Sequence, residues 1–364
     1  MGGEKKKKKS GSGNWKRNKK AILTGALALF VVLLAGAGII GYRYYRLVYN
    51  VNVDLHGSVT KYLYIPSNAD FTKVKTILYK EKYIIDSNSF EWLAEKKGYT
   101  QTVKAGRYLL RNGMTNNALI NLLRSGKQEP IKLTFNNVRT KDQFIAKLNT
   151  QLEADPEGVR KLLNDADFLK KYGLDTENVM CIFLPNTYEF YWNTTDTAFF
   201  SRMYREYSKF WNKSRVEKAA ADGLTKEQAV ILASIVYSET KKKDEMSRVA
   251  GVYMNRIERG IPLQADPTVI FAIGDFTIKR VLTAQTKFES PYNTYLHTGL
   301  PPGPICLPEP YVIDKVLDFE KHDYIFFCAK EDFSGYHNFA KTSAQHEQNA
   351  RKYRDALDRA KIKR

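Results

Sequence analysis

The sequence predicts an α+β protein with an N-terminal transmembrane helix, and three observations support this. A long uncharged apolar run lies near the N-terminus. Behind it, short segments that alternate like strands are interspersed with segments of helical periodicity. The 364 residues leave room for about two domains beyond the anchor. We therefore expect a basic tail, a membrane helix, a small α+β module with its juxtamembrane linker and a larger mixed α+β domain, at residues 1–20, 21–42, 43–130 and 131–364.

The apolar run Ala21–Gly41 has the length of a membrane span. Twenty-one residues cover roughly 30 Å as a helix, the thickness of a bilayer's hydrocarbon core. A signal peptide is the alternative, but its apolar core would be shorter and would end at a small-residue cleavage site. This run instead ends in Tyr42–Arg46 (YRYYR), which is typical of an interfacial anchor. Nine Lys and Arg against one Glu in residues 1–20 predict a cytoplasmic N-terminus, with the rest outside the cell (inner) membrane.

The net charge of +19 suits a polyanionic partner, such as nucleic acid, anionic lipid or an acidic wall polymer. No zinc-finger spacing, RNP-like motif or P-loop is present. The basic part of the chain that follows the span is also expected outside the cytoplasm, so we expect no nucleic-acid partner. Three cysteines without metal-ligand spacing and five scattered histidines predict neither a metal site nor a cofactor.

The sequence of the small module predicts a strand, helix, helix, strand order, followed by one more helix. Pro66 closes the first strand, Thr115 caps the last helix and Gly126 ends it. The expected elements are a strand around 62–64, helices 69–80 and 89–97, a strand 105–110 and a helix 115–126. Such a module could bind glycan or serve as a spacer.

The larger domain begins with a predicted strand at 131–135 and is mostly helical from Thr140 to about Leu224. An aromatic loop at 184–192 interrupts the helices and places Glu189 among several rings. Aromatic faces stack on sugars, so this loop could line a carbohydrate groove, although such clusters more often form core. Further along the chain we expect a helix 246–259, a strand 324–329, a turn at 334–335 and a charged helix from Thr342.

A helix predicted over Thr225–Thr240 carries an acidic residue on its apolar face. Thr225 and Gln228 have the spacing of a capping box. The apolar face continues one turn further to Glu239. Burial would raise the pKa of this carboxyl, so that it could both give and take a proton near neutral pH. Alternatively, Glu239 lies past the buried part of the helix and is only structural.

Three segments dense in Pro, Gly and polar residues follow, at 263–268, 290–295 and 298–305. Loops of fixed shape commonly build binding sites on a rigid scaffold, although they also serve as ordinary surface connections.

The motifs ILASIVYSET, LQADPT, SPYNTY, GLPPGPI and HNFAKTSAQH, in this order, resemble the YceG/MltG family of membrane-anchored endolytic murein transglycosylases. The resemblance runs with gaps from about Tyr62 to the C-terminus. The segment AGRYLLRNGMTNNALINLLRSGK also looks like the family's LysM-like module. The resemblance therefore implies a LysM-like module at 43–130 and a YceG-like catalytic domain at 131–364.

The family's catalytic glutamate lies in a segment that usually reads SIVEKET, which aligns with SIVYSET and implies that Glu239 is catalytic. Tyr237 and Ser238 stand where the family usually has Glu and Lys, and we expect Tyr237 to point elsewhere on the helix. The substrate-binding residues implied by the resemblance are Gln264, Asp266, Asn293, Thr294 and Tyr295.

The activity implied is cleavage of the MurNAc-β-1,4-GlcNAc bond in nascent peptidoglycan strands, with 1,6-anhydroMurNAc ends that terminate elongation. Attack by the sugar's own 6-hydroxyl needs one protein carboxyl, whereas a hydrolase normally needs two. The implied partners are glycan strands, the membrane and peptidoglycan synthases. Two alternatives stay open: a non-catalytic wall-binding scaffold, and a two-carboxylate muramidase using Asp266 or Glu189.

Overall fold

A computed structural model of the chain describes residues 12–360. Residues 1–11, which hold Lys5–Lys9 of the predicted basic tail, lie outside the described part. The chain divides into two compact units, unit 1 (Met1–Glu129) and unit 2 (Pro130–Arg364), and each is described by itself.

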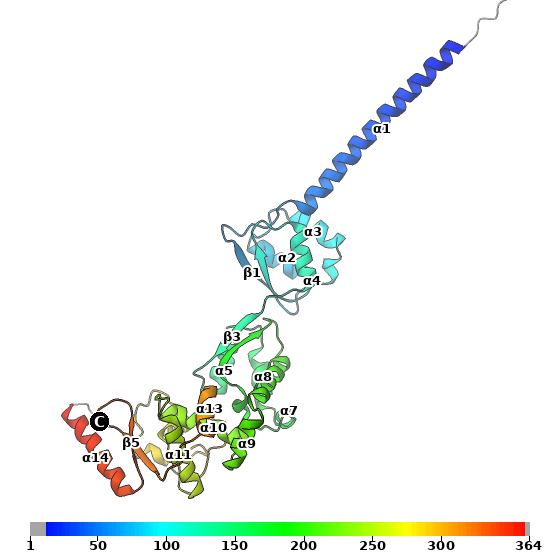
Figure 1. Cartoon of the computed structure of the whole chain (residues 1–364). Coiled ribbons are helices and arrows are strands. Elements are labelled where there is room, and N and C mark those ends of the chain that lie inside the picture. The colour runs from blue at the N-terminus through cyan, green and yellow to red at the C-terminus, as the bar shows by residue number, and fades with distance from the viewer. Residues whose placement is uncertain (1–11, 361–364) are drawn as a thin grey trace, which may run out of the picture. The chain divides into compact units, whose positions relative to one another are not determined.

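Unit 1 combines a long N-terminal helix with a small α+β module (Figure 1). Its elements are α1 (Ser12–Tyr49), β1 (Thr60–Ile65), α2 (Phe71–Lys80), α3 (Ser87–Lys96), the 3-10 turn η1 (Tyr99–Gln101), β2 (Gly106–Arg111) and α4 (Asn116–Ser125). Strands β1 and β2 pair antiparallel, with Thr60 opposite Arg111. The predicted strand, helix, helix, strand order of this module is confirmed.

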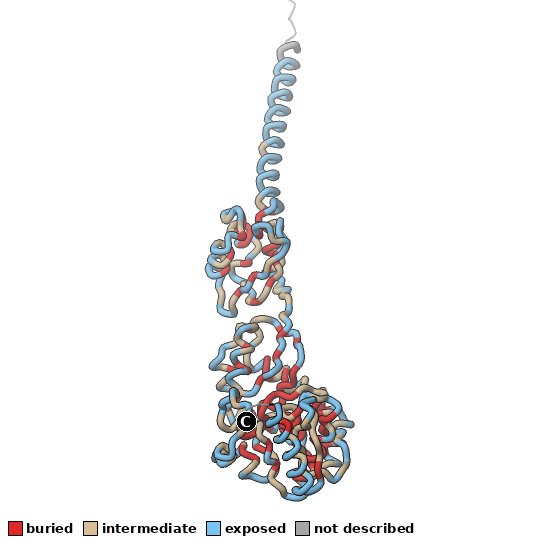
Figure 2. The backbone as a smooth tube through the Cα atoms, turned by 90° about the vertical axis from the view of Figure 1, so that its left-hand side faces the viewer, coloured by how far each residue is buried: buried red, intermediate tan, exposed pale blue. Residues whose placement is uncertain are grey.

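Helix α1 contains the predicted membrane span. Within the described residues it is the one helix long and apolar enough to cross a membrane. Figure 2 shows it exposed over almost its whole length, as expected for side chains that meet lipid. Its last turns pack on the module, because Val48 is buried and the Asn116 side chain donates to the Leu47 carbonyl at 3.0 Å.

Unit 2 begins with a strand pair that corrects one prediction. Strand β3 (Ile131–Phe135) pairs antiparallel with β4 (Asn186–Phe190), so the expected aromatic loop is largely a strand. Tyr188 and Phe190 alternate into the core, while Glu189 is exposed and lies opposite Lys132. The interpretation as core is confirmed for Tyr188 and Phe190, whereas Tyr191 is 55% exposed. Glu189 lies on the other face of the strand from the two buried rings.

Helices build most of the rest of unit 2. The helical stretch predicted after Thr140 is confirmed as α5 (Lys141–Asn149), α6 (Pro156–Asn164), α7 (Ala166–Lys170), the 3-10 turn η2 (Val179–Ile182), α8 (Asp196–Phe210) and α9 (Lys213–Ala221). The remaining elements are α10 (Lys226–Glu239), α11 (Met246–Glu258), α12 (Asp266–Ile273), the 3-10 turn η3 (Gln285–Lys287), α13 (Pro310–Leu317), β5 (Phe326–Ala329), β6 (His337–Ala340) and α14 (Ser343–Arg359).

The three predicted loops differ from one another. The segment 263–268 is only partly a loop, because α12 begins at Asp266 with Pro267 in its first turn, where a missing N–H costs nothing. The segment 290–295 is irregular, as predicted. Half of the residues of 298–305 are buried, including 303–305, and the Ile305 N–H donates to the Ser234 hydroxyl at 3.1 Å.

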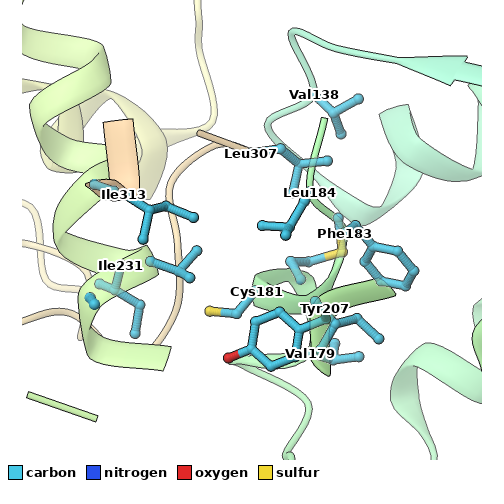
Figure 3. Packing of buried hydrophobic residues seen from close by; sticks show 14 of the residues in the cluster. Val138, Val179, Cys181, Phe183, Leu184, Tyr207, Ile231, Leu307 and Ile313 are labelled. Atoms are coloured by element: carbon cyan, nitrogen blue, oxygen red, sulfur yellow. The ribbon is translucent and has the colours of Figure 1, made fainter. Parts of the chain in front are cut away.

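Helix α10 runs through the core of unit 2. Its residues from Ala229 to Val236 are all buried, on every face of the helix. It packs against α11 and α13, and Figure 3 shows Ile231 of α10 and Ile313 of α13 in one apolar cluster with Tyr207 of α8. The predicted capping box is confirmed: the Gln228 N–H donates to the Thr225 hydroxyl at 3.1 Å and the Thr225 N–H to the Gln228 side-chain oxygen at 2.9 Å.

Removal of this cap should destabilise unit 2. Thr225→Ala should lower its free energy of unfolding by about 1 kcal/mol, since a helix N–H loses its acceptor. Thr225→Ser keeps the hydroxyl and should stay near the wild type. Urea denaturation followed by the fluorescence of buried Trp211 measures both variants. An Ala variant as stable as the Ser variant would contradict the role of the cap.

Candidate active site

Unit 2 contains a cavity of about 410 Å³, and Glu239 is one of the residues that line it. The C-terminus of α10, helix α11, the start of α12 and strands β5 and β6 all contribute to it. The lining residues are Glu239, Tyr253, Arg256, Leu263, Gln264, Asp266, Tyr295, Phe326, Phe327, Cys328, Ala329, His337 and His346. The structure therefore brings together four of the six residues expected at the site: Glu239, Gln264, Asp266 and Tyr295.

Glu239 is the last residue of α10, three residues after the end of its fully buried part at Val236. Its side chain is partly exposed to the cavity and otherwise surrounded by protein. Burial raises the pKa of this carboxyl from its ordinary value of 4.5 to about 7. A hydrogen bond from Tyr253 and the charge of Arg256 act in the opposite direction, and the negative charge of Asp266 adds to the rise. Near neutral pH both protonation states of Glu239 are therefore populated.

Two tyrosine–carboxyl pairs lie in the cavity. The Tyr253 hydroxyl donates to Glu239 Oε1 at 2.7 Å, and the Tyr295 hydroxyl donates to Asp266 Oδ1 at 2.6 Å. Burial raises the pKa of Asp266 as well, and the hydrogen bond from Tyr295 opposes this rise. Each tyrosine fixes the direction of one carboxyl and favours its charged form.

Arg256 is a buried cation beside Glu239, and it donates to three backbone carbonyls and, at 3.4 Å, to the Gln264 side-chain oxygen. Its guanidinium donates to Ile325 O at 2.6 Å, Leu263 O at 2.9 Å and Pro262 O at 3.0 Å. These bonds join the segment before α12 to the start of β5. Arg256 therefore shapes the cavity wall while its charge favours ionisation of Glu239.

Gln264 is the one exposed residue among those that line this cavity. Its backbone is left-handed, with φ of 52°, a conformation that costs a non-glycine residue of order 1 kcal/mol. The Gln264 N–H donates to Thr294 O at 3.0 Å, and its side chain lies at the surface of the cavity.

Asn293 and Thr294 are buried and do not line the cavity. The Asn293 amide donates to Phe288 O at 2.8 Å and Thr286 O at 3.0 Å. The Thr294 hydroxyl accepts from the Ala265 N–H at 3.0 Å. The Thr294 hydroxyl holds the 290–295 loop against the start of α12, while the Asn293 side chain ties this loop to residues 286–288. The structure therefore places both side chains behind the cavity wall.

Tyr237 and Ser238 line a different cavity, of about 390 Å³, which shares no lining residue with the one at Glu239. Tyr237 thus points elsewhere on the helix, as expected. Its ring lies 3.7 Å from the Lys241 Nζ. The two positions at which this sequence departs from SIVEKET therefore do not change the wall around Glu239.

Several residues of the cavity were not identified from the sequence. Tyr253 lies on the apolar face predicted for α11. Its hydroxyl, which donates to Glu239, was the one feature of the sequence that could have indicated a polar contact on this face. His337 is held by the buried Glu245, whose two oxygens lie 2.8 Å from the His337 N–H and Nδ1. Within residues 12–360, no three His, Cys, Asp or Glu side chains are grouped so as to hold a metal ion.

The sequence profile of the YceG-like family matches residues 63–352. The chain belongs to the YceG-like family. The matched range includes the cavity residues around Glu239 and most of the module of unit 1.

This YceG-like chain is similar to curated proteins named endolytic murein transglycosylase. It is 29% identical over 321 residues to the one from Bacillus subtilis (strain 168), covering 83% of this chain and 87% of that protein. It is 27% identical over 355 residues to the one from Streptococcus pneumoniae serotype 2 (strain D39), covering 88% of this chain and 63% of that protein. The chain thus spans less than two thirds of the pneumococcal relative.

Among solved structures, a YceG-like protein from Listeria monocytogenes has a similar fold, with a TM-score of 0.53 and 26% sequence identity. The match covers 80% of this chain and 98% of that one.

The raised pKa of Glu239 makes a prediction about stability. Between pH 4.5 and about 7 the folded chain holds a proton on Glu239 that the unfolded chain has lost, so this group lowers stability as pH rises through that range. Glu239→Gln removes the buried charge and should stabilise unit 2 at pH 8 by up to about 3 kcal/mol, with little effect at pH 4.

Chemical denaturation at the two pH values measures this difference. Glu189→Gln, which removes an exposed carboxyl from the same unit, is the matched control and should change neither value. A Glu239→Gln variant no more stable than the wild type at pH 8 would contradict a raised pKa.

Proposed function

We propose that this protein is an endolytic murein transglycosylase that cleaves the MurNAc-β-1,4-GlcNAc bond within nascent glycan strands. The observation that carries the proposal is a single carboxyl with a pKa of about 7, held by Tyr253 at the wall of a cavity large enough for sugar rings. The names of the relatives from B. subtilis and S. pneumoniae support the same activity.

In the first step, protonated Glu239 donates its proton to the glycosidic oxygen as the bond from that oxygen to C1 of the muramic acid breaks. The leaving GlcNAc thereby gains a hydroxyl, and positive charge develops at C1. Glu239 is then a carboxylate, which the Tyr253 hydroxyl stabilises through its 2.7 Å hydrogen bond.

In the second step, the muramic acid 6-hydroxyl attacks C1 while the Glu239 carboxylate accepts its proton. The new C1–O6 bond closes the 1,6-anhydro ring, Glu239 returns to its protonated form, and no water is consumed. One carboxyl performs both steps because its pKa lies near the working pH, so neither transfer is strongly uphill.

A second candidate is a two-carboxylate muramidase, because Asp266 lines the same cavity and its charge acts on Glu239. In that reaction Asp266 would assist a water molecule or act as nucleophile, and the product would be a reducing end. Glu189 is exposed on β4 and does not line the cavity, so this role would fall to Asp266.

The proposal extends to the setting of the enzyme. Helix α1 would anchor the chain in the cell membrane, with the basic N-terminus in the cytoplasm and the small module and unit 2 outside. Residues 43–130 would form a LysM-like module and residues 131–364 the catalytic domain, and the strand, helix, helix, strand order supports the module. Such an anchor would hold the enzyme near peptidoglycan synthases, where strands emerge.

Product analysis on purified uncrosslinked glycan strands tests the activity. The wild type should produce internal cuts with 1,6-anhydroMurNAc ends. Glu239→Gln should lower the rate at least about 100-fold, the lower end of what general acid–base groups contribute. Glu189→Gln is the matched control and should cut normally.

Other outcomes would favour a different function or mechanism for this protein. Reducing ends would favour the muramidase, and Asp266→Asn should then abolish them. Strand binding without any cutting would favour a wall-binding scaffold. Unchanged cutting by Glu239→Gln would remove Glu239 from the mechanism.

The dependence of kcat/KM on pH tests the role of Tyr253. Its hydrogen bond lowers the pKa of Glu239, so Tyr253→Phe should raise that pKa. The activity that is lost as Glu239 deprotonates should then persist to a pH higher by about half a unit to one unit, the equivalent of one hydrogen bond. Tyr336→Phe, which changes an exposed hydroxyl on Asp244, is the control. A shift toward lower pH would contradict this role.

A further inference from the structure

Unit 1 contains a cavity of about 530 Å³ that the proposed reaction does not use. It lies where the last turns of α1 meet the module. The lining residues are Arg43, Arg46, Leu47, Asn50, Val51, Asn52, Ile85, Asp86, Ser89 and Asn116.

Two cations of α1 face this cavity. Arg43 and Arg46 are three residues apart, so their side chains lie on one face of the helix. Neither guanidinium is ion-paired with a carboxylate in the described part of the chain, and both are exposed. Two neighbouring guanidinium groups present the fork of donors that binds phosphate oxygens.

Asp86 is the one acidic residue of the lining. Its carboxylate accepts from the N–H groups of Asn88 at 3.1 Å and Ser89 at 3.3 Å, and so caps α3. Its negative charge is therefore directed to the helix N-terminus, where it is stabilised, and not to the arginines.

Part of the lining is apolar. Val51 and Ile85 are 56% and 62% exposed, and Leu47 also lines the cavity. Exposed apolar side chains next to unpaired guanidinium groups suit a ligand that carries C–H groups beside its phosphate, as a lipid headgroup does.

A buried polar network forms the floor and holds α1 to the module. The Asn52 amide donates to the Asn116 side-chain oxygen at 2.6 Å, and the Asn116 amide donates to Ser89 Oγ at 2.9 Å and Leu47 O at 3.0 Å. These bonds satisfy the buried amides and fix the last turns of α1 relative to α3 and α4, so the cavity is formed before any ligand binds.

The position of the cavity relative to the membrane span indicates the class of ligand. The apolar run of α1 ends at Gly41, so Arg43 and Arg46 lie roughly 3 Å and 8 Å beyond it along the helix axis, at the level of lipid headgroups. Exposed Tyr42, Tyr45 and Tyr49 surround this turn as an aromatic belt.

We propose that this cavity binds the headgroup of an anionic phospholipid. The phosphate lies against Arg43 and Arg46, and the part of the headgroup beyond the phosphate lies against Leu47, Val51 and Ile85. The inference rests on the proposed membrane span of α1 but not on the proposed reaction, so either can fail without the other. Lipid bound there would hold the module at the membrane surface.

Native mass spectrometry of the full chain in detergent tests the site, with phosphatidylglycerol and phosphatidylcholine of equal chain length as probes. The wild type should bind a first phosphatidylglycerol at least about 10-fold more tightly than phosphatidylcholine. Arg43→Gln/Arg46→Gln should abolish this preference. Lys73→Gln/Lys80→Gln removes the same charge from exposed positions of α2 and should keep it. Ile85→Ser, a change at an exposed position, should weaken phosphatidylglycerol binding several-fold with both arginines present.

Four outcomes would overturn the proposal. They are equal binding of the two lipids, an unchanged preference in the arginine variant, and an equal loss in the lysine control, which would reflect net charge alone. The fourth is displacement of phosphatidylglycerol by inorganic phosphate or farnesyl diphosphate at lower concentration, which would assign the cavity to a free anion or to a lipid diphosphate.

Discussion

The candidate site of unit 2 depends on the burial of one carboxyl at the end of an apolar helix. Helix α10 is enclosed on all faces from Ala229 to Val236, and that packing fixes the position of its last residue, Glu239. The apolar burial stabilises the fold, while the carboxyl it carries into the interior is costly to ionise. A pKa of about 7 is the direct result, and it is the property that acid–base chemistry near neutral pH requires. The same burial that makes Glu239 useful therefore makes it destabilising when charged.

The other residues of the site fix the orientation of this carboxyl and keep it accessible to a ligand in the cavity. Tyr253 orients it from α11, while Arg256 holds the wall of the cavity through backbone carbonyls. Behind the wall, Thr294 supports the start of α12 and so the position of Asp266. Several bonds of the site join parts of the chain far apart in sequence, such as Arg256 to Ile325 O and Tyr295 to Asp266. The geometry of the site therefore depends on the folding of the whole unit.

Local patterns in the sequence predicted the elements that depend on local interactions. The capping box located the start of α10, and helical spacing placed Glu239 on its buried face. Strand β4 was missed because a five-residue strand has little periodicity of its own, and its partner β3 lies some fifty residues earlier. Asn293 and Thr294 have the residue types of a binding loop, but the sequence does not tell whether such side chains point toward a ligand or into the protein. Tyr253 was missed for a related reason, since a tyrosine on an apolar face is ordinarily core.

The central claim is that the fold itself holds the pKa of Glu239 near 7. The most direct measurement is an infrared difference titration of the carboxyl band, comparing the wild type with Glu239→Gln so that only this group contributes. The account predicts one carboxyl that loses its proton with a midpoint near pH 7 and is absent from the variant. A midpoint near the ordinary value of 4.5 would contradict it, because Glu239 would then be fully ionised at neutral pH and unable to act first as an acid.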